Sequence, residues 1–307
     1  MDFTKIELNT SERGSTFPFE DDRDYWSFEG RSEREFSHAF LQYPAMMVPQ
    51  MQGEIIDHIL KEFPRTKHVW DPFVGSGTSL GETMLRGLDF SGNDINPLAV
   101  LVSKTKCGPL NVAALKEKMK KLFLLIAADP SDRVEVTFPG IDKWFTPEAA
   151  LALSKVRRGV CQEDSLWARR FFWVAFAETI RLTSNSRTST YKLHIRSTEN
   201  LLKERKNPIS VFTTTLTNNV NHLSAFKEQL AKRKLLSGGW YKGETTISLC
   251  NTIDLPKSFI PAKNADLIIT SPPYGDNQTT IPYGQYSYLP LNDGATRRIF
   301  GIRVIRG

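Results

Sequence analysis

Cysteine is scarce in this chain of 307 residues. The three cysteines, Cys107, Cys161 and Cys250, lie far apart and have neither the spacing of metal ligands nor that of a disulfide framework. Such isolated cysteines are typical of buried, reduced thiols in a cytosolic protein. We therefore expect no metal site, no disulfide and a cytoplasmic location.

Long hydrophobic runs are also missing. The longest apolar stretches, residues 122–128 and 171–177, are far shorter than the roughly 20 residues that a membrane-spanning helix needs. Residues 1–7 are charged and contain no apolar run, which argues against a signal peptide. No internal repeat or low-complexity tract is visible. The sequence predicts a protein without a membrane partner.

The composition is that of a soluble globular protein, with 40% hydrophobic and 24% charged residues. Its length corresponds to one large or two modest domains. The net charge of +6 fits an anionic partner such as nucleic acid, but many proteins without such a partner are equally basic. Charge alone therefore does not indicate DNA binding.

A βαβ unit is predicted in the first third of the chain. Residues 1–36 are polar and rich in charge, and we interpret them as an N-terminal arm. Residues 51–63 have helical spacing. Strands are predicted at 68–71 and 90–95, joined by a glycine turn and a helix at 80–86.

The middle of the chain has a different pattern, because helical periodicity dominates it in four segments: 113–127, 147–160, 164–182 and 220–236. Strand character returns at 245–250 and 265–270. Leu267, Ile268 and Ile269 are apolar on both faces of the second strand, which is typical of a parallel sheet covered by helices. We predict an α/β fold with a discontinuous core, residues 37–106 and 241–307, interrupted by a mostly helical insertion, residues 107–240.

The first motif with chemical content follows the first strand and reads Asp71-Pro72-Phe73-Val74-Gly75-Ser76-Gly77-Thr78. Its two glycines allow a tight turn and the close approach of a ligand to the backbone. The helix that follows offers free N–H groups, and the carboxylate of Asp71 suits a ligand with an ammonium group. Asp94 ends the next strand, where an acid takes a ribose diol in doubly wound nucleotide folds. The alternative is a tight turn without a ligand.

The second motif is Ser271-Pro272-Pro273-Tyr274, directly after the last predicted strand. Two prolines fix the backbone and leave their carbonyls free to accept hydrogen bonds. With a hydroxyl before them and an aromatic ring after them, the prolines form a rigid binding site for a planar amine. Holding both amine hydrogens turns the nitrogen lone pair toward an electrophile. The alternative is a Pro-Pro loop that merely ends a strand.

The two motifs together resemble motifs I and IV of the amino-group DNA methyltransferases, and residues 38–49 resemble motif X of that family. The resemblance implies a Rossmann-like class I methyltransferase sheet, bound S-adenosylmethionine and double-stranded DNA whose target base is flipped out of the helix. Ser-Pro-Pro-Tyr is most typical of the enzymes that methylate N4 of cytosine. We therefore expect an N4-cytosine DNA methyltransferase of a prokaryotic restriction-modification system. Methylation of N6 of adenine or of an RNA base amine is the alternative within this chemistry.

The resemblance also assigns roles to individual residues. The expected cofactor-binding residues are Asp71, Pro72, Phe73, Gly75, Gly77, Thr78, Asp94, Asn251 and Tyr43. The expected catalytic residues are Ser271, Pro272, Pro273 and Tyr274. Asn251 stands where the family often has an acid near the adenine, and an asparagine can still hydrogen-bond the base edge. The implied mechanism is a direct in-line methyl transfer that needs no metal and no covalent enzyme intermediate.

The basic excess is concentrated in residues 151–207, which contain 12 lysines and arginines but only 5 acidic residues. Residues 184–194 combine cations, hydroxyl groups and an aromatic ring, a set that can contact phosphates. Our hypothesis is that Arg187 and Lys192 bind DNA. The alternative is a solvated basic layer of helices.

Only 33 of the 307 residues follow Tyr274, whereas the family fold needs three more strands after motif IV. Without them the motif IV strand would lie at the edge of the sheet with an uncovered apolar face. We therefore expect a methyltransferase that is split or truncated at the C-terminus, and a second polypeptide that completes the sheet. A non-catalytic fragment that binds DNA or a partner is the alternative from another functional class.

Overall fold

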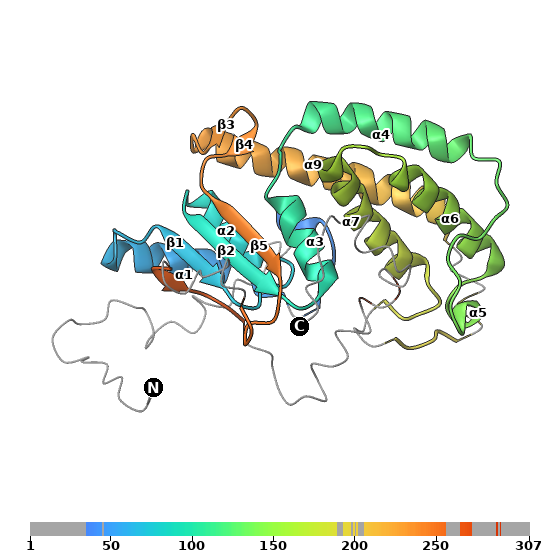
Figure 1. The fold of residues 1–307 in the computed structure, drawn as a ribbon, viewed down its shortest axis with the longest axis horizontal. Coiled ribbons are helices and arrows are strands. Elements are labelled where there is room, and N and C mark those ends of the chain that lie inside the picture. Colours follow the sequence, from blue (N-terminus) through green and yellow to red (C-terminus); the bar gives the residue numbers. More distant parts are fainter. Residues whose placement is uncertain are drawn as a thin grey trace.

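Four parallel strands form the main sheet in the order β5-β2-β1-β6. They are β1 (His68–Asp71), β2 (Asp89–Asp94), β5 (Thr245–Leu249) and β6 (Leu267–Ile268). The computed structural model shown in Figure 1 describes residues 35–44, 46–188, 193–197, 199, 201, 206–255, 265–271, 287 and 289. Within this part, the predicted α/β fold with a parallel sheet is confirmed.

The helices around the sheet follow the predicted βαβ pattern. Helix α2 (Thr78–Leu85) connects β1 to β2 and packs against both, and α3 (Pro97–Lys106) packs against β2 and β5. Helix α1 (Pro49–Glu62) precedes β1 and packs on α2, as does the short 3₁₀ helix η1 (Phe36–Ala39).

The order of the strands creates a switch point between β1 and β6. From β1 the chain moves to β2 and then to β5 on one side, whereas β6 pairs with the opposite side of β1. In open α/β sheets, ligands bind outside the carboxyl ends of the strands at such a point. This topology directs attention to the ends of β1 and β6.

The helical region lies to the right of the sheet in Figure 1 and comprises α4 (Val112–Ala127), α5 (Ile141–Trp144), α6 (Pro147–Cys161), α7 (Leu166–Thr183) and α9 (Pro208–Lys232). Helix α7 packs on α3 and α9 packs on η1. The rings of Phe40 and Phe171 meet edge to face, with centroids 5.3 Å apart. Buried side chains of the sheet and of these helices form one continuous apolar cluster. The domain boundaries at 107 and 240 stay a prediction.

Several helices begin at a capping residue followed by proline. Asn96 accepts a hydrogen bond from the backbone N–H of Leu98, and Asn207 accepts from the N–H groups of Ile209 and Ser210. Proline at the first helical position lacks an N–H that would have no partner there. These local signals explain why α3 and α9 begin where they do.

Two predictions about helices were incomplete. Helix α9 begins at Pro208, twelve positions before the predicted start at residue 220, and α3 was not predicted as a helix. The first turns of α9 are rich in threonine and valine, which have low intrinsic helix propensity. Burial of Phe212 and Leu216 in the core outweighs that preference.

The prediction that β6 is buried on both faces was wrong. Strand β6 comprises two residues, and Ile268 leaves 57% of its surface exposed. In the part of the chain that the structure describes, β6 pairs with β1 alone and forms one end of the strand order. The expectation that this strand lies at a sheet edge agrees with this arrangement.

Two smaller features complete the described fold. Strands β3 (Leu236–Ser237) and β4 (Trp240–Tyr241) form an antiparallel pair before β5.

The cysteines are free thiols, but Cys161 is exposed and the other two are half-buried, so the expected burial was wrong. Among the described helices, none combines the length and apolarity that crossing a bilayer requires.

Candidate functional site

The carboxyl ends of β1, β2 and β5 bring the predicted cofactor residues to one edge of the sheet. Asp71 is the last residue of β1 and pairs in register with Gly92 of β2. Asp94 ends β2 and pairs with Leu249, the last residue of β5, after which Asn251 follows. Residues far apart in sequence thus share one rim.

Asp71 lies at the centre of this rim and is completely buried. One carboxylate oxygen accepts a hydrogen bond of 3.0 Å from the backbone N–H of Phe73, and the other accepts one from the hydroxyl of Ser79. Burial raises the pKa of Asp71 to about 6, against the opposing effect of these hydrogen bonds. No cation is among the groups that shift this pKa. A cationic ligand group would therefore stabilise the carboxylate strongly.

The glycine turn adopts the backbone conformation that its sequence predicts. Gly75 and Gly77 have φ of 51° and 75°, in the left-handed region where other residues are strained. Gly77 is the N-cap of α2 and provides no side chain to cap it, while Thr78 is buried as the first helical residue. The N-terminal N–H groups and the positive end of the helix dipole therefore suit an anionic group such as a carboxylate.

Asp94 joins the glycine turn to the start of α3. Its Oδ2 accepts from the N–H of Gly75 at 2.9 Å and its Oδ1 from the N–H of Asn96 at 2.8 Å. Burial raises its pKa above the ordinary value. Asn96 also donates its side-chain amide to the hydroxyl of Tyr43 at 3.0 Å, so Tyr43 and Asp94 belong to one site. The ring of Tyr43 lies 3.6 Å from the point where a Cβ on Gly75 would stand.

Asn93 and Thr252 also belong to this rim, although the sequence did not predict them as site residues. The carbonyl of Pro72 accepts a 3.1 Å bond from the Asn93 side chain and a 2.6 Å bond from the Thr252 hydroxyl. Asn93 also accepts from the indole N–H of Trp70 and donates to Thr252. This network holds the loop after β5 against the loop after β1. The available signal was a polar residue in the middle of a predicted strand.

Exposed apolar side chains follow each of these three strands. Phe73 is 46% exposed, Ile95 71% and Ile253 87%. Each comes within four positions of the last residue of its strand, and such a gathering of exposed apolar groups at a polar rim marks a contact surface. Phe73 was predicted as a cofactor contact, but Ile95 and Ile253 were not. The repeated position after a strand would have indicated them.

The remaining predicted site residues differ in how fully the structure describes them. Asn251 is exposed, and its side chain accepts from the N–H of Ile253 at 3.1 Å. Ser271 is half-buried just after β6, where Ile269 donates to the carbonyl of Trp70 in β1 at 3.1 Å. The Ser-Pro-Pro-Tyr motif therefore starts at the same edge as Asp71. Pro272, Pro273 and Tyr274 lie outside the described residues.

The predicted DNA-binding residues lie beyond the end of α7. Arg187 is exposed, and its N–H donates to the carbonyl of His194 across a short bridge between Ser186 and Ile195. Lys192 lies outside the described residues. Arg181, near the end of α7, donates to the side chain of Gln42 at 3.1 Å. This bond links the end of α7 to the segment that carries Tyr43.

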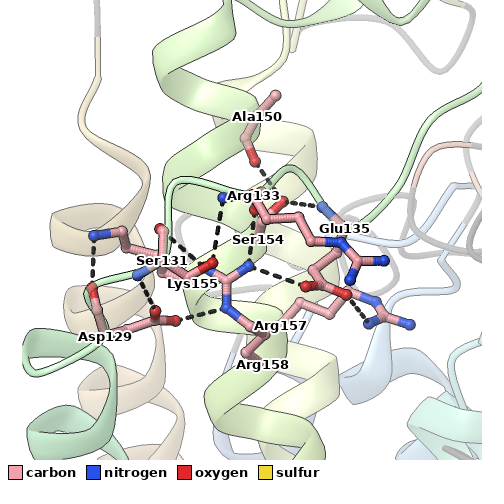
Figure 2. A network of polar contacts seen from close by, with 9 residues as sticks. All are labelled: Asp129, Ser131, Arg133, Glu135, Ala150, Ser154, Lys155, Arg157 and Arg158. Atoms are coloured by element: carbon pink, nitrogen blue, oxygen red, sulfur yellow. Dashed lines mark hydrogen bonds and ion pairs between the residues drawn. The ribbon is translucent and has the colours of Figure 1, made fainter.

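Part of the basic excess counted in residues 151–207 is neutralised within the fold. Figure 2 shows the loop at 129–135 wrapped against α6. Arg158 forms ion pairs with Asp129 at 2.7 Å and with Glu135 at 3.1 Å, and it also donates to two loop carbonyls. Arg157 contacts the same glutamate at 3.7 Å. These arginines stabilise the helical region, so their number overstates the charge that is open to DNA.

The part of the chain that the structure describes contains no group of three or more histidine, cysteine or acidic side chains arranged to hold a metal ion. The polar groups at the rim are instead carboxylates, amides and hydroxyls that bind one another and the backbone. Their chemistry fits an organic ligand with both charged and apolar parts.

Comparison with known proteins gives two curated relatives. The chain is 33% identical over 280 residues to the Type II methyltransferase M.MvaI of Kocuria varians, a match that covers 88% of this chain and 60% of that relative. It is 30% identical over 102 residues to the Type II methyltransferase M.MjaII of Methanocaldococcus jannaschii, covering 32% of this chain and 18% of the relative. No family model and no solved structure matches the chain.

The first match extends across both the sheet and the helical region, since it includes 88% of the chain. The chain nevertheless spans only about 60% of the length of that relative. The parallel sheet with its glycine turn is consistent with the Rossmann-like fold expected of such a protein. The sequence comparison therefore shows that the protein is a homologue of the Type II methyltransferases, and the parallel sheet agrees with this relationship.

Proposed function

We propose that the protein transfers a methyl group from S-adenosylmethionine to the N4 amine of cytosine in double-stranded DNA, as part of a restriction-modification system. One observation carries this proposal. Asp71, the glycine turn and Ser271 meet at the carboxyl edge of the sheet, at the switch point between β1 and β6. A cofactor and a target amine bound there would lie side by side.

The rim suits each part of S-adenosylmethionine. The N-terminus of α2 suits the carboxylate of the methionine part, and Asp71, with no cation among the groups that act on its pKa, suits the ammonium group. Asp94 suits the ribose hydroxyls. Phe73 and Ile95, both exposed, can pack on the flat faces of the adenine. When bound, this cofactor supplies the electrophilic methyl group.

The protein's own contribution to the reaction is orientation and removal of water. In the proposed mechanism the hydroxyl of Ser271 accepts a hydrogen bond from the target amine, and the Pro272 carbonyl accepts the second. Both bonds turn the nitrogen lone pair toward the methyl group, and Tyr274 stacks on the flipped base. Transfer would form the nitrogen–methyl bond as the sulfur–methyl bond of the cofactor breaks, leaving a neutral thioether, and the amine would then release one proton to solvent. Because the methyl group passes directly to the amine, no covalent bond to the enzyme forms.

Two measurements test this function. Isothermal calorimetry of the purified chain is expected to show binding of S-adenosylmethionine, and digestion of methylated DNA is expected to yield N4-methylcytosine. Ser271→Ala should retain cofactor binding and lose about 100-fold in transfer rate, as for removal of one group that acts only in the transition state. N6-methyladenine, or methylated RNA, would support the alternative substrates. An absence of cofactor binding would favour a non-catalytic fragment.

Arg187 is proposed to contact DNA phosphates, because it is exposed beyond α7, whose last turn bonds through Arg181 to the segment that carries Tyr43. Arg187→Glu should weaken DNA binding several-fold and lower the slope of log affinity against log salt concentration by roughly 1. Lys121→Glu, on the exposed side of α4, is the control and should change neither. Equal effects of both variants would mean that Arg187 acts only through net charge.

The outer side of β6 is proposed to receive additional strands in the active protein. Ile268 is 57% exposed there, and unpaired strand edges tend to associate with other strands. Co-expression with a polypeptide matching the remainder of the Kocuria varians relative should raise soluble yield and methyl transfer. Strong transfer by the chain alone would contradict this part of the proposal.

A further inference from the structure

The inner side of the glycine turn is held by two side chains of α3, neither of which belongs to a recognised motif. Ser103 donates its hydroxyl to the carbonyl of Gly75 at 3.1 Å. Lys106 donates its ammonium group to the carbonyl of Gly77 at 3.2 Å. Because residues three apart on a helix share one face, a single face of α3 reaches both glycines of the turn.

Both side chains are buried. Ser103 is fully buried and Lys106 is 1% exposed, which is rare for a lysine because burial of a charge without a close partner is costly. Three ionisable groups act on Lys106 or are acted on by it: Cys107, directly after α3, Glu82 of α2 and His38 of η1. Burial lowers the pKa of Lys106 to about 7, although Cys107 and Glu82 act in the opposite direction.

Glu82 does not bind Lys106 directly, because two other side chains, His38 and Arg86, already occupy its carboxylate. His38 contacts one of its carboxylate oxygens at 3.1 Å, and Arg86 binds the other at 2.8 Å. The hydrogen bond that the structure gives the Lys106 ammonium group is the one to Gly77, whose carbonyl also accepts the first bond of α2 from Gly81. The lysine is thus directed at the start of α2.

The turn and α3 also fit each other in shape. A Cβ on Gly77 would lie 2.9 Å from the hydroxyl oxygen of Ser103, closer than real Cβ contacts. The serine therefore occupies the space that the missing side chain leaves. The N–H of Gly77 bonds to the carbonyl of Val74 at 2.8 Å, so the turn is fixed from within as well as from α3.

We infer that Ser103 and Lys106 are positioning residues for the cofactor: they hold the glycine turn in the left-handed conformation that receives the methionine end of S-adenosylmethionine. This inference rests on the proposed function, since it assumes that this cofactor binds at the turn. It explains why the fold keeps a lysine in an apolar interior. Without these bonds the carbonyls of Gly75 and Gly77 would each lose a donor from α3, and the turn would sample other conformations.

Calorimetric titration of the full chain with S-adenosylmethionine between pH 6 and pH 9 tests the inference. Ser103→Ala should weaken binding about fivefold at every pH, as for loss of one neutral hydrogen bond. Lys106→Met should weaken it about tenfold at pH 6 and much less at pH 9, because the charged ammonium makes the stronger bond. The ratio of the variant's affinity to the wild-type affinity at each pH is compared, because the titration of the ligand itself affects both proteins equally.

Thr105→Val is the matched control. Thr105 is buried on the same helix, but its hydroxyl donates to Leu101 of α3 and not to the turn. This variant should leave the affinity unchanged even if it lowers the melting temperature. In the free protein, hydrogen exchange at the Gly77 amide should be faster in Ser103→Ala and Lys106→Met than in Thr105→Val.

The outcomes separate the two proposals. If the wild type does not bind S-adenosylmethionine, the proposed function and this inference both fail. If the wild type binds but Ser103→Ala and Lys106→Met match it in affinity, pH profile and exchange rate, this inference alone fails. Should Lys106→Met not fold, Ser103→Ala against Thr105→Val decides the question.

Discussion

Charged groups at the carboxyl edge of the sheet and charged groups in the helical region are treated in opposite ways. Asp71 is buried with hydrogen bonds from neutral groups, and Lys106 is buried facing a backbone carbonyl. Arg158 lies between two carboxylates and two carbonyls at the surface of α6 (Figure 2). Arg158, which stabilises the helical region, is thus paired with carboxylates. Asp71, which lies where a ligand is expected, has no cation among the groups that shift its pKa.

This contrast has a cost in stability at the sheet edge. A carboxylate without a cation partner destabilises the folded state, and the raised pKa of Asp71 is the sign of it. Ion pairs around Arg158 have the reverse effect, holding the pKa of Asp129 below its ordinary value through the hydrogen bond from Arg158. Substitutions in the two regions should therefore change different properties.

The largest expected effect is that of Asp71→Asn. Loss of the carboxylate should lower the affinity for S-adenosylmethionine about 100-fold, because a buried ion pair with the ligand ammonium is lost. The melting temperature of the free protein should not fall, since the amide removes a buried charge and keeps the shape. Calorimetry and thermal unfolding measure the two quantities.

Asp57→Asn provides the matched control for Asp71→Asn. Asp57 binds Arg86 at 2.6 Å and lies away from the turn, so its loss should lower the melting temperature slightly and leave the affinity unchanged. A stable Asp71→Asn variant with wild-type affinity for S-adenosylmethionine would contradict the proposal that the unpaired carboxylate at the sheet edge serves to bind a ligand.

A smaller effect is expected from pH. The ligand ammonium prefers ionised Asp71, whose pKa in the free protein is about 6. Affinity should therefore fall about tenfold from pH 8 to pH 5, and Asp71→Asn should show no such fall beyond the ligand's own titration. Calorimetry across this range, with the variant as reference, makes the comparison.

The stability of the free protein should change in the opposite sense. Between about pH 4 and 6 the folded protein keeps a proton on Asp71 that the unfolded chain has lost. The free energy of unfolding of the wild type, relative to Asp71→Asn, should accordingly decrease as the pH rises through this window. A relative increase would show that a cation already compensates Asp71.

The smallest effect is expected from Arg158→Ala. Its removal leaves the loop at 129–135 without its main contacts to α6 and should lower the melting temperature by about 2–4 °C. Affinity for S-adenosylmethionine should stay at the wild-type value. Lys120→Ala, which removes an exposed pair with Glu117, is the control and should change neither quantity. A loss of affinity in Arg158→Ala would mean that the two regions are coupled.

Much of the sheet edge was predictable because its signals are local. Gly75 and Gly77 stand in a turn that only a left-handed backbone can make, and Asp71 and Asp94 end the two strands of the βαβ unit around this turn. Asn93 was missed since a polar residue within a strand has no defined role until its neighbours are known. Its partners, Trp70 and Thr252, lie 23 and 159 positions away.

The helical region was predictable in kind but less so in detail. The periodic apolar residues predicted most helices, yet α9 starts earlier because Phe212 packs into the core. The count of arginines favoured a DNA-binding surface, but it could not reveal that Arg157 and Arg158 bind Glu135. Pairing of charges depends on which loop folds back onto which helix.

The sequence by itself determined the turn, the strands that flank it and the family, because each depends on residues adjacent in the chain or spaced by a regular period. Only the tertiary structure decided that the Lys106 ammonium group bonds to the carbonyl of Gly77 and that Ile268 leaves 57% of its surface exposed. Burial and hydrogen bonding between distant segments are set by packing, and no local pattern encodes them. The three cysteines are free thiols, so no disulfide holds the fold together. One cluster of buried apolar side chains joins the sheet to the helices instead.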